Sequence, residues 1–170
     1  MFMTAREFWT VIHGLLLGTV YLLAFSGGFA ELWSLWKNGE AAGNLQKRVR
    51  RIAWGAWVMA ITGWLTLFTG TYIVYPWYRE KTADSPRSFL LADPLRSAWH
   101  TFGMEWKEHI AWMSPILATA VAVILISYGE SVAKRRDIVA WIIFLFVFAF
   151  LTAAVAGLFG AFINKVAPIH

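Results

Sequence analysis

Four long apolar stretches divide the chain, and shorter polar segments separate them. The apolar stretches cover residues 8–36, 52–75, 107–128 and 138–163. Each has about the 20 residues that an α-helix needs to cross the hydrocarbon core of a bilayer. The pattern therefore predicts an all-α protein: an integral membrane four-helix bundle in which residues 1–170 form a single membrane domain.

The polar connection between the second and third stretches has a helix signal of its own. Asp93 and Pro94 are typical of an N-cap followed by a first-turn proline. Trp99, Phe102 and Trp106 follow at spacings that place them on one helical face. We therefore expect a short helix that lies in the membrane interface before the third span begins.

Two prolines and several small residues refine the predicted spans. Pro76 is expected to end the second helix, and Pro115 to kink the third, because proline supplies no backbone N–H. Small residues at helical spacing permit two helices to approach closely, either inside this chain or against a partner. They are Gly14 and Gly18; Ala56, Ala60 and Gly63; Ser114, Ala118 and Ala122; and Ala153, Gly157 and Ala161.

The composition agrees with a membrane location and narrows the chemistry. Hydrophobic residues make up 59% of the chain and charged residues 15%, which excludes an ordinary soluble domain. The 11 tryptophans are typical of membrane interfaces, or of sites for flat aromatic cofactors. The chain has no cysteine, so iron–sulfur clusters, thiolate zinc sites and covalently attached c-type haem are excluded.

The positive charges indicate an orientation in the membrane. The loops after the first and third helices hold eight of the 15 Lys and Arg residues. By the positive-inside rule these loops lie in the cytoplasm, and both termini then lie outside. The net charge of +5 reflects this loop basicity and not nucleic-acid binding. The chain is expected to be a multi-pass protein of a bacterial inner membrane.

Three histidines are the candidate ligands of a cofactor. His13 lies within the first apolar stretch, where a polar side chain is costly and tends to face the bundle interior. His109 opens the third stretch at a similar expected depth, and His100 lies shortly before it. Two neutral imidazoles on facing helices can hold a haem iron from both sides. The sequence thus predicts one haem b near the outer (periplasmic) face, with His13 and His109 as axial ligands and His100 as a substitute.

Further side chains are candidates for contacts with the same cofactor. Trp106 and Tyr72 are expected to pack on the porphyrin, and Arg96 to bind a propionate through charge-assisted hydrogen bonds. Arg79 and Lys107 are alternatives for the role of Arg96. The competing interpretation is that these aromatic and cationic residues form the ordinary belt at a membrane interface.

The stretch from Trp99 to His109 permits other interpretations. Glu105 and His109 are four residues apart and, with His13 or His100, would suit copper, zinc or iron in a metal-dependent membrane enzyme. Glu105 and the nearby Glu108 would relay protons if a quinol were oxidised at the outer surface. They would otherwise be solvated acids at the start of a helix. His13, in turn, would otherwise be hydrogen-bonded to a neighbouring helix.

The features that carry a family resemblance are the four spans and the histidines His13 and His109, with His100 as a substitute. In these features the chain resembles the four-helix b-type cytochrome subunits that anchor respiratory complexes in bacterial membranes. This resemblance implies axial histidines on separate helices and electron exchange with quinone. The chain lacks a second histidine pair on the cytoplasmic side, so at most one haem is implied.

The function that follows from the sequence is a membrane electron-transfer subunit of a larger respiratory complex. Its expected partners are the other membrane subunits of that complex, the lipid bilayer and quinone. The alternative is a cofactor-free accessory subunit that packs against such a complex and stabilises it through its small-residue faces.

Overall fold

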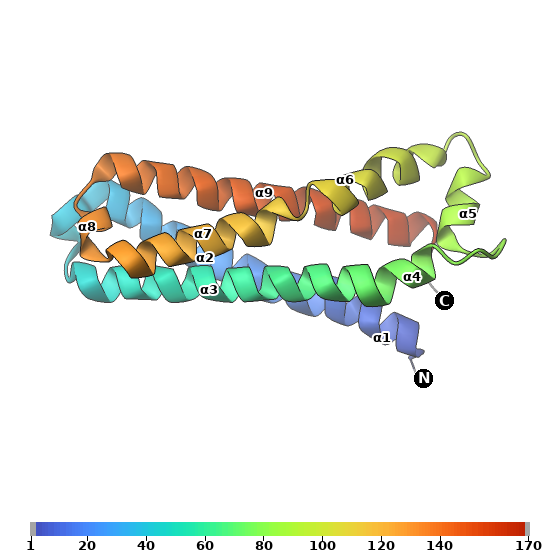
Figure 1. Ribbon diagram of the computed structural model, residues 1–170, viewed down its shortest axis with the longest axis horizontal. Helices are drawn as coiled ribbons and strands as arrows, with labels where there is room; N and C mark the ends of the chain where they lie inside the picture. Colours follow the sequence, from blue (N-terminus) through green and yellow to red (C-terminus); the bar gives the residue numbers. More distant parts are fainter. Residues whose placement is uncertain (1–2, 169–170) are drawn as a thin grey trace. The chain divides into compact units, whose positions relative to one another are not determined.

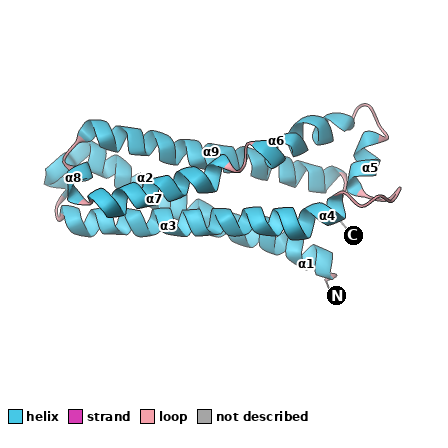
Figure 2. Ribbon diagram, viewed as in Figure 1, coloured by secondary structure: helices cyan, strands magenta, loops and turns pink. Residues whose placement is uncertain are grey.

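The computed structural model describes residues 3–168, except for the side chains of residues 40 and 42. All regular elements in this range are helices, and none is a strand (Figure 1, Figure 2). Four helices are long and apolar enough to cross a membrane: Ala5–Asn38, Leu45–Tyr78, Trp99–Tyr128 and Arg136–Val166. The all-α prediction and the four candidate spans are therefore confirmed, and they are consistent with a helical bundle.

The long helices contain shorter segments that differ in pitch. The first comprises α1 (Ala5–Val11), η1 (Ile12–Leu16) and α2 (Leu17–Asn38). After the 3₁₀ turn η2 (Gly39–Ala42), the second comprises α3 (Leu45–Thr69), η3 (Gly70–Val74) and α4 (Tyr75–Tyr78). After the short α5 (Pro86–Leu91), the third comprises η4 (Trp99–Met104), α6 (Glu105–His109) and α7 (Met113–Tyr128). The short α8 (Glu130–Ala133) leads into α9 (Arg136–Val166). The segments η1, η3 and η4 are π-helical.

Local interactions explain where the first two long helices begin and end. The Thr4 hydroxyl accepts the Glu7 N–H, and the Glu7 carboxylate accepts the Thr4 N–H at 2.7 Å. This capping box starts the helix at Ala5, ahead of the predicted start at residue 8. The second helix runs past Pro76 to Tyr78, so the prediction that it stops at the proline is wrong. The π turn η3 ends at Val74, two residues before the proline, and it accommodates a residue that has no N–H to donate.

A short helix lies between the second and third long helices, but not where the sequence predicted it. It is α5, which the Ser85 hydroxyl caps by accepting the Ser88 N–H. Asp93, the predicted N-cap, instead holds a turn in which its carboxylate accepts the Leu95 N–H at 2.9 Å. Residues 99–106, predicted to form the interfacial helix, belong to the start of the third long helix.

The third long helix is interrupted near its proline, as expected. A turn at residues 110–112 separates α6 from α7, and the N–H groups of Ile110 and Ala111 both point to the Trp106 carbonyl. The ring of Pro115 would clash with the carbonyl four residues earlier, which in a regular helix belongs to Ala111. The interruption therefore lies one turn ahead of the proline that causes it.

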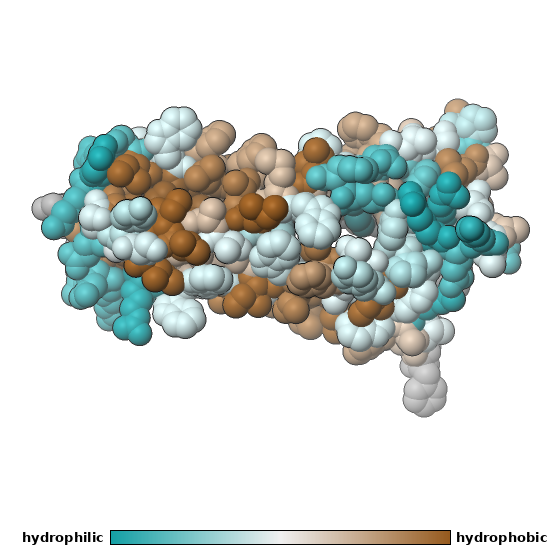
Figure 3. All heavy atoms as spheres, in the orientation of Figure 1, coloured by the Kyte–Doolittle hydropathy of each residue, from teal (hydrophilic) through white to brown (hydrophobic). Residues whose placement is uncertain are grey.

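Contacts divide the chain into two compact units, and each long helix contributes to both. Unit 1 comprises Met1–Gly18, Trp64–Trp112 and Thr152–His170, and unit 2 comprises Thr19–Gly63 and Met113–Leu151. In unit 1, Figure 3 shows hydrophilic residues gathered over α5 and α6. The core of unit 1 contains Tyr78, Leu90, Met104, Ile163 and Ala167, with Tyr75, Trp99 and Val166 packed against it. That the chain forms a single membrane domain, with both termini outside, stays a prediction.

In unit 2, the small residues of the second and third helices are used for packing inside the chain. The buried ones are Ala56, Ala60, Ser114, Ala118 and Ala122. Gly63 packs on Pro115, which an added Cβ would approach to 3.3 Å. Figure 3 shows hydrophobic side chains along α7 and α9 in this unit and hydrophilic ones around α8. These two small-residue faces are therefore not available to a partner helix.

An ion-pair cluster joins α2 and α3 in unit 2. The Glu31 carboxylate accepts hydrogen bonds from Arg48 at 2.8 Å and from Arg51 at 2.7 Å. We expect Glu31→Ala to lower the free energy of unfolding in detergent by about 1–3 kcal/mol, because it removes two charge-assisted contacts from a partly buried site. The control is Asp137→Ala, which removes an exposed pair with Arg135 and is expected to leave stability almost unchanged. Equal melting temperatures for the two variants would contradict this prediction.

Candidate functional site

The three histidines that the structure describes all lie in unit 1. His13 is in the π turn η1, His100 is in the π turn η4, and His109 ends α6. A π turn rotates the side chains that follow it relative to a regular helix, and such turns are frequent at functional sites. Unit 1 therefore brings the histidine of the first helix together with residues 99–109. His170 lies outside the described residues.

His13 is held by the second long helix. Its Nδ1 lies 3.0 Å from the Thr69 hydroxyl oxygen, and that hydroxyl donates its one hydrogen to the Leu65 carbonyl at 2.8 Å. In neutral His13 we therefore assign the proton to Nδ1, which leaves the lone pair on Nε2. An added Cβ at Gly70 would come 2.7 Å from the ring carbon Cε1, so the ring packs directly against η3. Both the tautomer and the ring position of His13 are thus set by its neighbours.

His100 is buried and pairs with a tyrosine. Its Nδ1 lies 2.8 Å from the Tyr78 hydroxyl oxygen, and the exposed fractions of His100 and Tyr78 are 6% and 2%. The guanidinium groups of Arg87 and Arg79 and the Glu108 carboxylate lie within electrostatic reach of the imidazole. The core of unit 1 thus contains a buried polar pair with charged groups around it.

We expect Tyr78→Phe to destabilise unit 1. The change keeps the ring but removes the hydroxyl that pairs with His100, and an unpaired buried polar atom costs about 1–3 kcal/mol. The measurement is thermal unfolding in detergent. The matched control is Tyr72→Phe, because the Tyr72 side chain is 74% exposed. Indistinguishable unfolding curves for the two variants would contradict the assigned role of the pair.

Polar atoms near this pair lack protein partners. Glu108 lies 3.6 Å from Arg79, which is too long for a direct hydrogen bond. Within the described residues, Oε1 of Glu108, Nε of Arg87 and Nε1 of Trp106 are buried and accept or donate no hydrogen bond. Buried polar atoms are usually satisfied, so each of these three atoms is a position where a further polar group would be stabilised.

Lys107 points from α6 towards α9. An added Cβ at Gly160 would come 2.8 Å from the Lys107 Nζ, so the ammonium fills the space that this glycine leaves. Within residues 3–168, the side chain makes no hydrogen bond and no ion pair. The ammonium also lies within electrostatic reach of the His13 imidazole. Unit 1 therefore contains an uncompensated cation close to the histidine of the first helix.

His109 lies at the surface of unit 1. Its side chain is 68% exposed, and its Nδ1 is 3.0 Å from the Glu105 carbonyl and 3.4 Å from the Glu105 carboxylate. The expected shared face of Glu105 and His109 is thus confirmed. Among the described residues, however, no group of three or more His, Cys, Asp or Glu side chains is placed to hold a metal ion. The alternative centre with His13 or His100 as a further ligand therefore finds no support.

The other predicted cofactor contacts differ in position. Trp106 is partly buried, and its indole packs against the rings of Phe102 and Phe159, which also contact each other. Arg96 instead forms an ion pair with Asp93 at 3.2 Å. Tyr72 is exposed and stacks on a neighbouring ring of its own helix. Of these three residues, only Trp106 thus lies beside the buried groups of unit 1.

Sequence reasoning missed the partners that fix the histidines. The sequence interpretation allowed a hydrogen bond between His13 and a neighbouring helix, which Thr69 provides. It did not identify Thr69 as that partner or Tyr78 as the partner of His100, because both contacts depend on how the helices pack. Lys107, by contrast, was named from the sequence as an alternative contact for a propionate, and it is the first residue of the predicted span 107–128.

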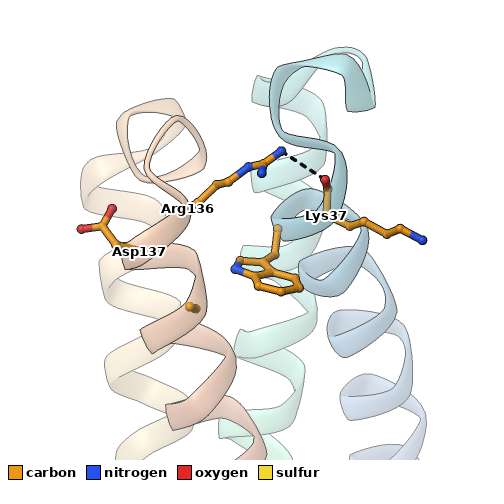
Figure 4. Close-up of a pocket in the computed structure, with 5 residues that line it drawn as sticks. Lys37, Arg136 and Asp137 are labelled. Carbon is orange, nitrogen blue, oxygen red and sulfur yellow. Dashed lines mark hydrogen bonds between the residues drawn. The ribbon is translucent and has the colours of Figure 1, made fainter.

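Unit 2 has an open pocket with charged residues in its lining. It is lined by Trp36, Lys37, Arg136, Asp137 and Ala140. Figure 4 shows the Arg136 guanidinium donating to the Lys37 carbonyl, at 3.2 Å, while the Lys37 ammonium and the Asp137 carboxylate point away. The charged groups do not converge on one point, so the arrangement favours no ligand.

Comparison of the chain with protein families, curated proteins and solved structures finds no match. The functional argument therefore rests on the side chains of unit 1.

Proposed function

We propose that the chain is a membrane electron-transfer subunit that holds one haem b in unit 1, within a larger respiratory complex of a bacterial inner membrane that exchanges electrons with quinone. The observation that carries this proposal is the position of His13. Its Nδ1 is tied to Thr69, and its ring lies against Gly70. A histidine ligand in proteins is typically fixed in this way, through the nitrogen that does not bind the metal.

Each described residue of the site has a defined part in this proposal. His13 would use Nε2 to bind the iron, and Thr69 would set the direction of that nitrogen. Trp106, with its buried and unpaired Nε1, would provide an aromatic wall and a hydrogen-bond donor. When bound, haem b supplies an iron that takes up and releases one electron at a time.

A second histidine that would hold the haem is proposed to come from residues 99–109. His109 is the ligand predicted from the sequence, and its Nδ1 is bound to the Glu105 carbonyl, which leaves Nε2 available. His100 is held in the same manner by Tyr78 and, unlike His109, is buried. Burial favours His100, because a haem ligand inside a membrane protein is shielded from water.

The test is an optical spectrum of the purified protein from haem-supplied cells, before and after reduction with dithionite. We expect a sharp α-band of the b type on reduction. The haem content should fall in His13→Ala and in one of the two variants His100→Ala and His109→Ala. A wild-type spectrum without haem bands would overturn the proposal. Wild-type haem content in His13→Ala would overturn the assignment of the first ligand.

The second candidate function is a cofactor-free accessory subunit, and the first long helix favours it. Only 6% of its most apolar 18-residue window is buried, against 28–39% in the other three long helices. An added Cβ at Gly14 or Gly18 would meet nothing within 4 Å. This open face suits close approach by a helix of another subunit. The two functions are alternatives: a wild-type protein without haem bands would leave the accessory subunit as the function that the open face supports.

A further inference from the structure

In the described part of unit 1, the Lys107 ammonium is a charge without an ion-pair partner. It lies in α6, within one of the four helices that are long and apolar enough to cross a membrane. An ionisable side chain in such a position is costly unless a partner of opposite charge or a polar ligand accompanies it. In the described part of the chain, Lys107 has neither an ion pair nor a hydrogen bond.

The acidic residues closest to Lys107 in the sequence do not pair with its ammonium. Glu105 lies 3.4 Å from the Nδ1 of His109, and Glu108 lies 3.6 Å from the Arg79 guanidinium. Both acids are on the same helix as Lys107, where residues one or two positions apart do not face each other. The protein therefore supplies no anion to this ammonium from its own helix.

The fourth long helix leaves room at the end of the Lys107 side chain. Any residue larger than glycine at position 160 would carry a Cβ about where the ammonium lies, at 2.8 Å from Nζ. His13 is close enough to interact electrostatically with the same ammonium. Lys107 is thus partly buried in unit 1, within electrostatic reach of the proposed haem ligand.

We infer that Lys107 is the binding residue for an anionic group, a carboxylate or a phosphate, carried by a ligand that enters unit 1 from the membrane. The group would accept hydrogen bonds from the ammonium and neutralise its charge. Two ligands carry this chemistry. A carboxylate would come from a propionate of haem, and this source rests on the proposed function. A phosphate would come from the head group of an anionic phospholipid, and this source does not.

The experiment compares each anionic ligand with a neutral counterpart, using the full chain in detergent. Native mass spectrometry measures binding of phosphatidylglycerol against phosphatidylcholine. Optical titration measures binding of haemin against haemin dimethyl ester, which lacks the propionate charges. The variants are Lys107→Met, which removes the ammonium, and Gly160→Ala, which keeps the charge but displaces it. Lys165→Met, which changes an exposed lysine of α9, is the control.

We expect the wild type and Lys165→Met to bind one anionic ligand at least about tenfold more tightly than its neutral counterpart, as is typical of a hydrogen bond between charged groups. Lys107→Met and Gly160→Ala should both lose this preference. Preference for phosphatidylglycerol identifies the phosphate, and preference for haemin identifies the carboxylate.

Absence of both preferences in the wild type, or their persistence in Lys107→Met and Gly160→Ala, would overturn the inference. Gly160→Ala decides the outcome if Lys107→Met does not fold. If haemin does not bind at all and the phosphatidylglycerol preference depends on Lys107, the proposed function fails while the anion site stands.

Discussion

His13→Ala is expected to remove haem from the purified protein, with loss of the Soret band and of the α-band on reduction. The imidazole is the proposed ligand within the first long helix, and alanine offers no atom that could replace Nε2. The measurement is the ratio of haem to protein by the pyridine haemochrome method, together with the difference spectrum. A folded His13→Ala protein with a wild-type haem ratio would contradict this expectation.

Thr69→Val separates ligation from packing at the same site. The change keeps the shape of the side chain but removes the hydroxyl that holds the His13 Nδ1 at 3.0 Å. Loss of such an outer contact typically weakens metal or cofactor binding by about 10- to 100-fold. We expect weaker haem binding and a shifted reduction potential, neither of which a merely structural threonine would produce. The matched control is Thr101→Val, since the Thr101 side chain is exposed.

Gly28→Ala is expected to cause a large loss of stability in unit 2. A Cβ at this position would come 2.8 Å from Cζ of Phe146, whose side chain is fully buried. Overpacking of this kind costs about 1–3 kcal/mol, because the ring or the backbone must shift. The measurement is thermal unfolding in detergent, where this cost should lower the melting temperature by several degrees.

Two further variants make the packing argument specific. Gly27 is the neighbouring glycine, and an added Cβ there would meet nothing within 4 Å, so Gly27→Ala should be neutral or slightly stabilising. In the double variant Gly28→Ala/Phe146→Leu, the smaller side chain makes room for the new methyl group. This double variant should recover part of the lost stability. A Gly28→Ala protein as stable as Gly27→Ala would show that the contact does not limit the packing of these helices.

The two units differ in what their interiors contain. Unit 2 is packed around small residues, aromatic rings and the Tyr21 hydroxyl, which bonds to Ser114 at 2.6 Å and to the Ala149 carbonyl at 3.0 Å. Unit 1 contains the three described histidines, the uncompensated Lys107 and buried polar atoms without partners. Polar groups inside apolar helices cost free energy, so their concentration in one unit indicates where function is located.

The sequence by itself determined the helical architecture and the positions of the four candidate spans, because a long apolar run in a chain this poor in charge has one stable backbone solution in a membrane. It also singled out His13, since a histidine inside such a run is rare. The ends of the helices were less well determined. Thr4 and Ser85 act through side-chain hydrogen bonds, and the π turn before Pro76 has no simple sequence pattern.

Only the tertiary structure decided which side chains meet. Thr69 binds His13 and Tyr78 binds His100, while Lys107 lies over Gly160, and each of these contacts joins residues far apart in the sequence. Whether a histidine is buried depends on the rotation of its helix, and the π turns change that rotation by an amount that hydrophobic periodicity does not encode. For this reason the sequence placed His109 ahead of His100 as a candidate ligand, and only their packing showed that His109 is exposed and His100 is buried.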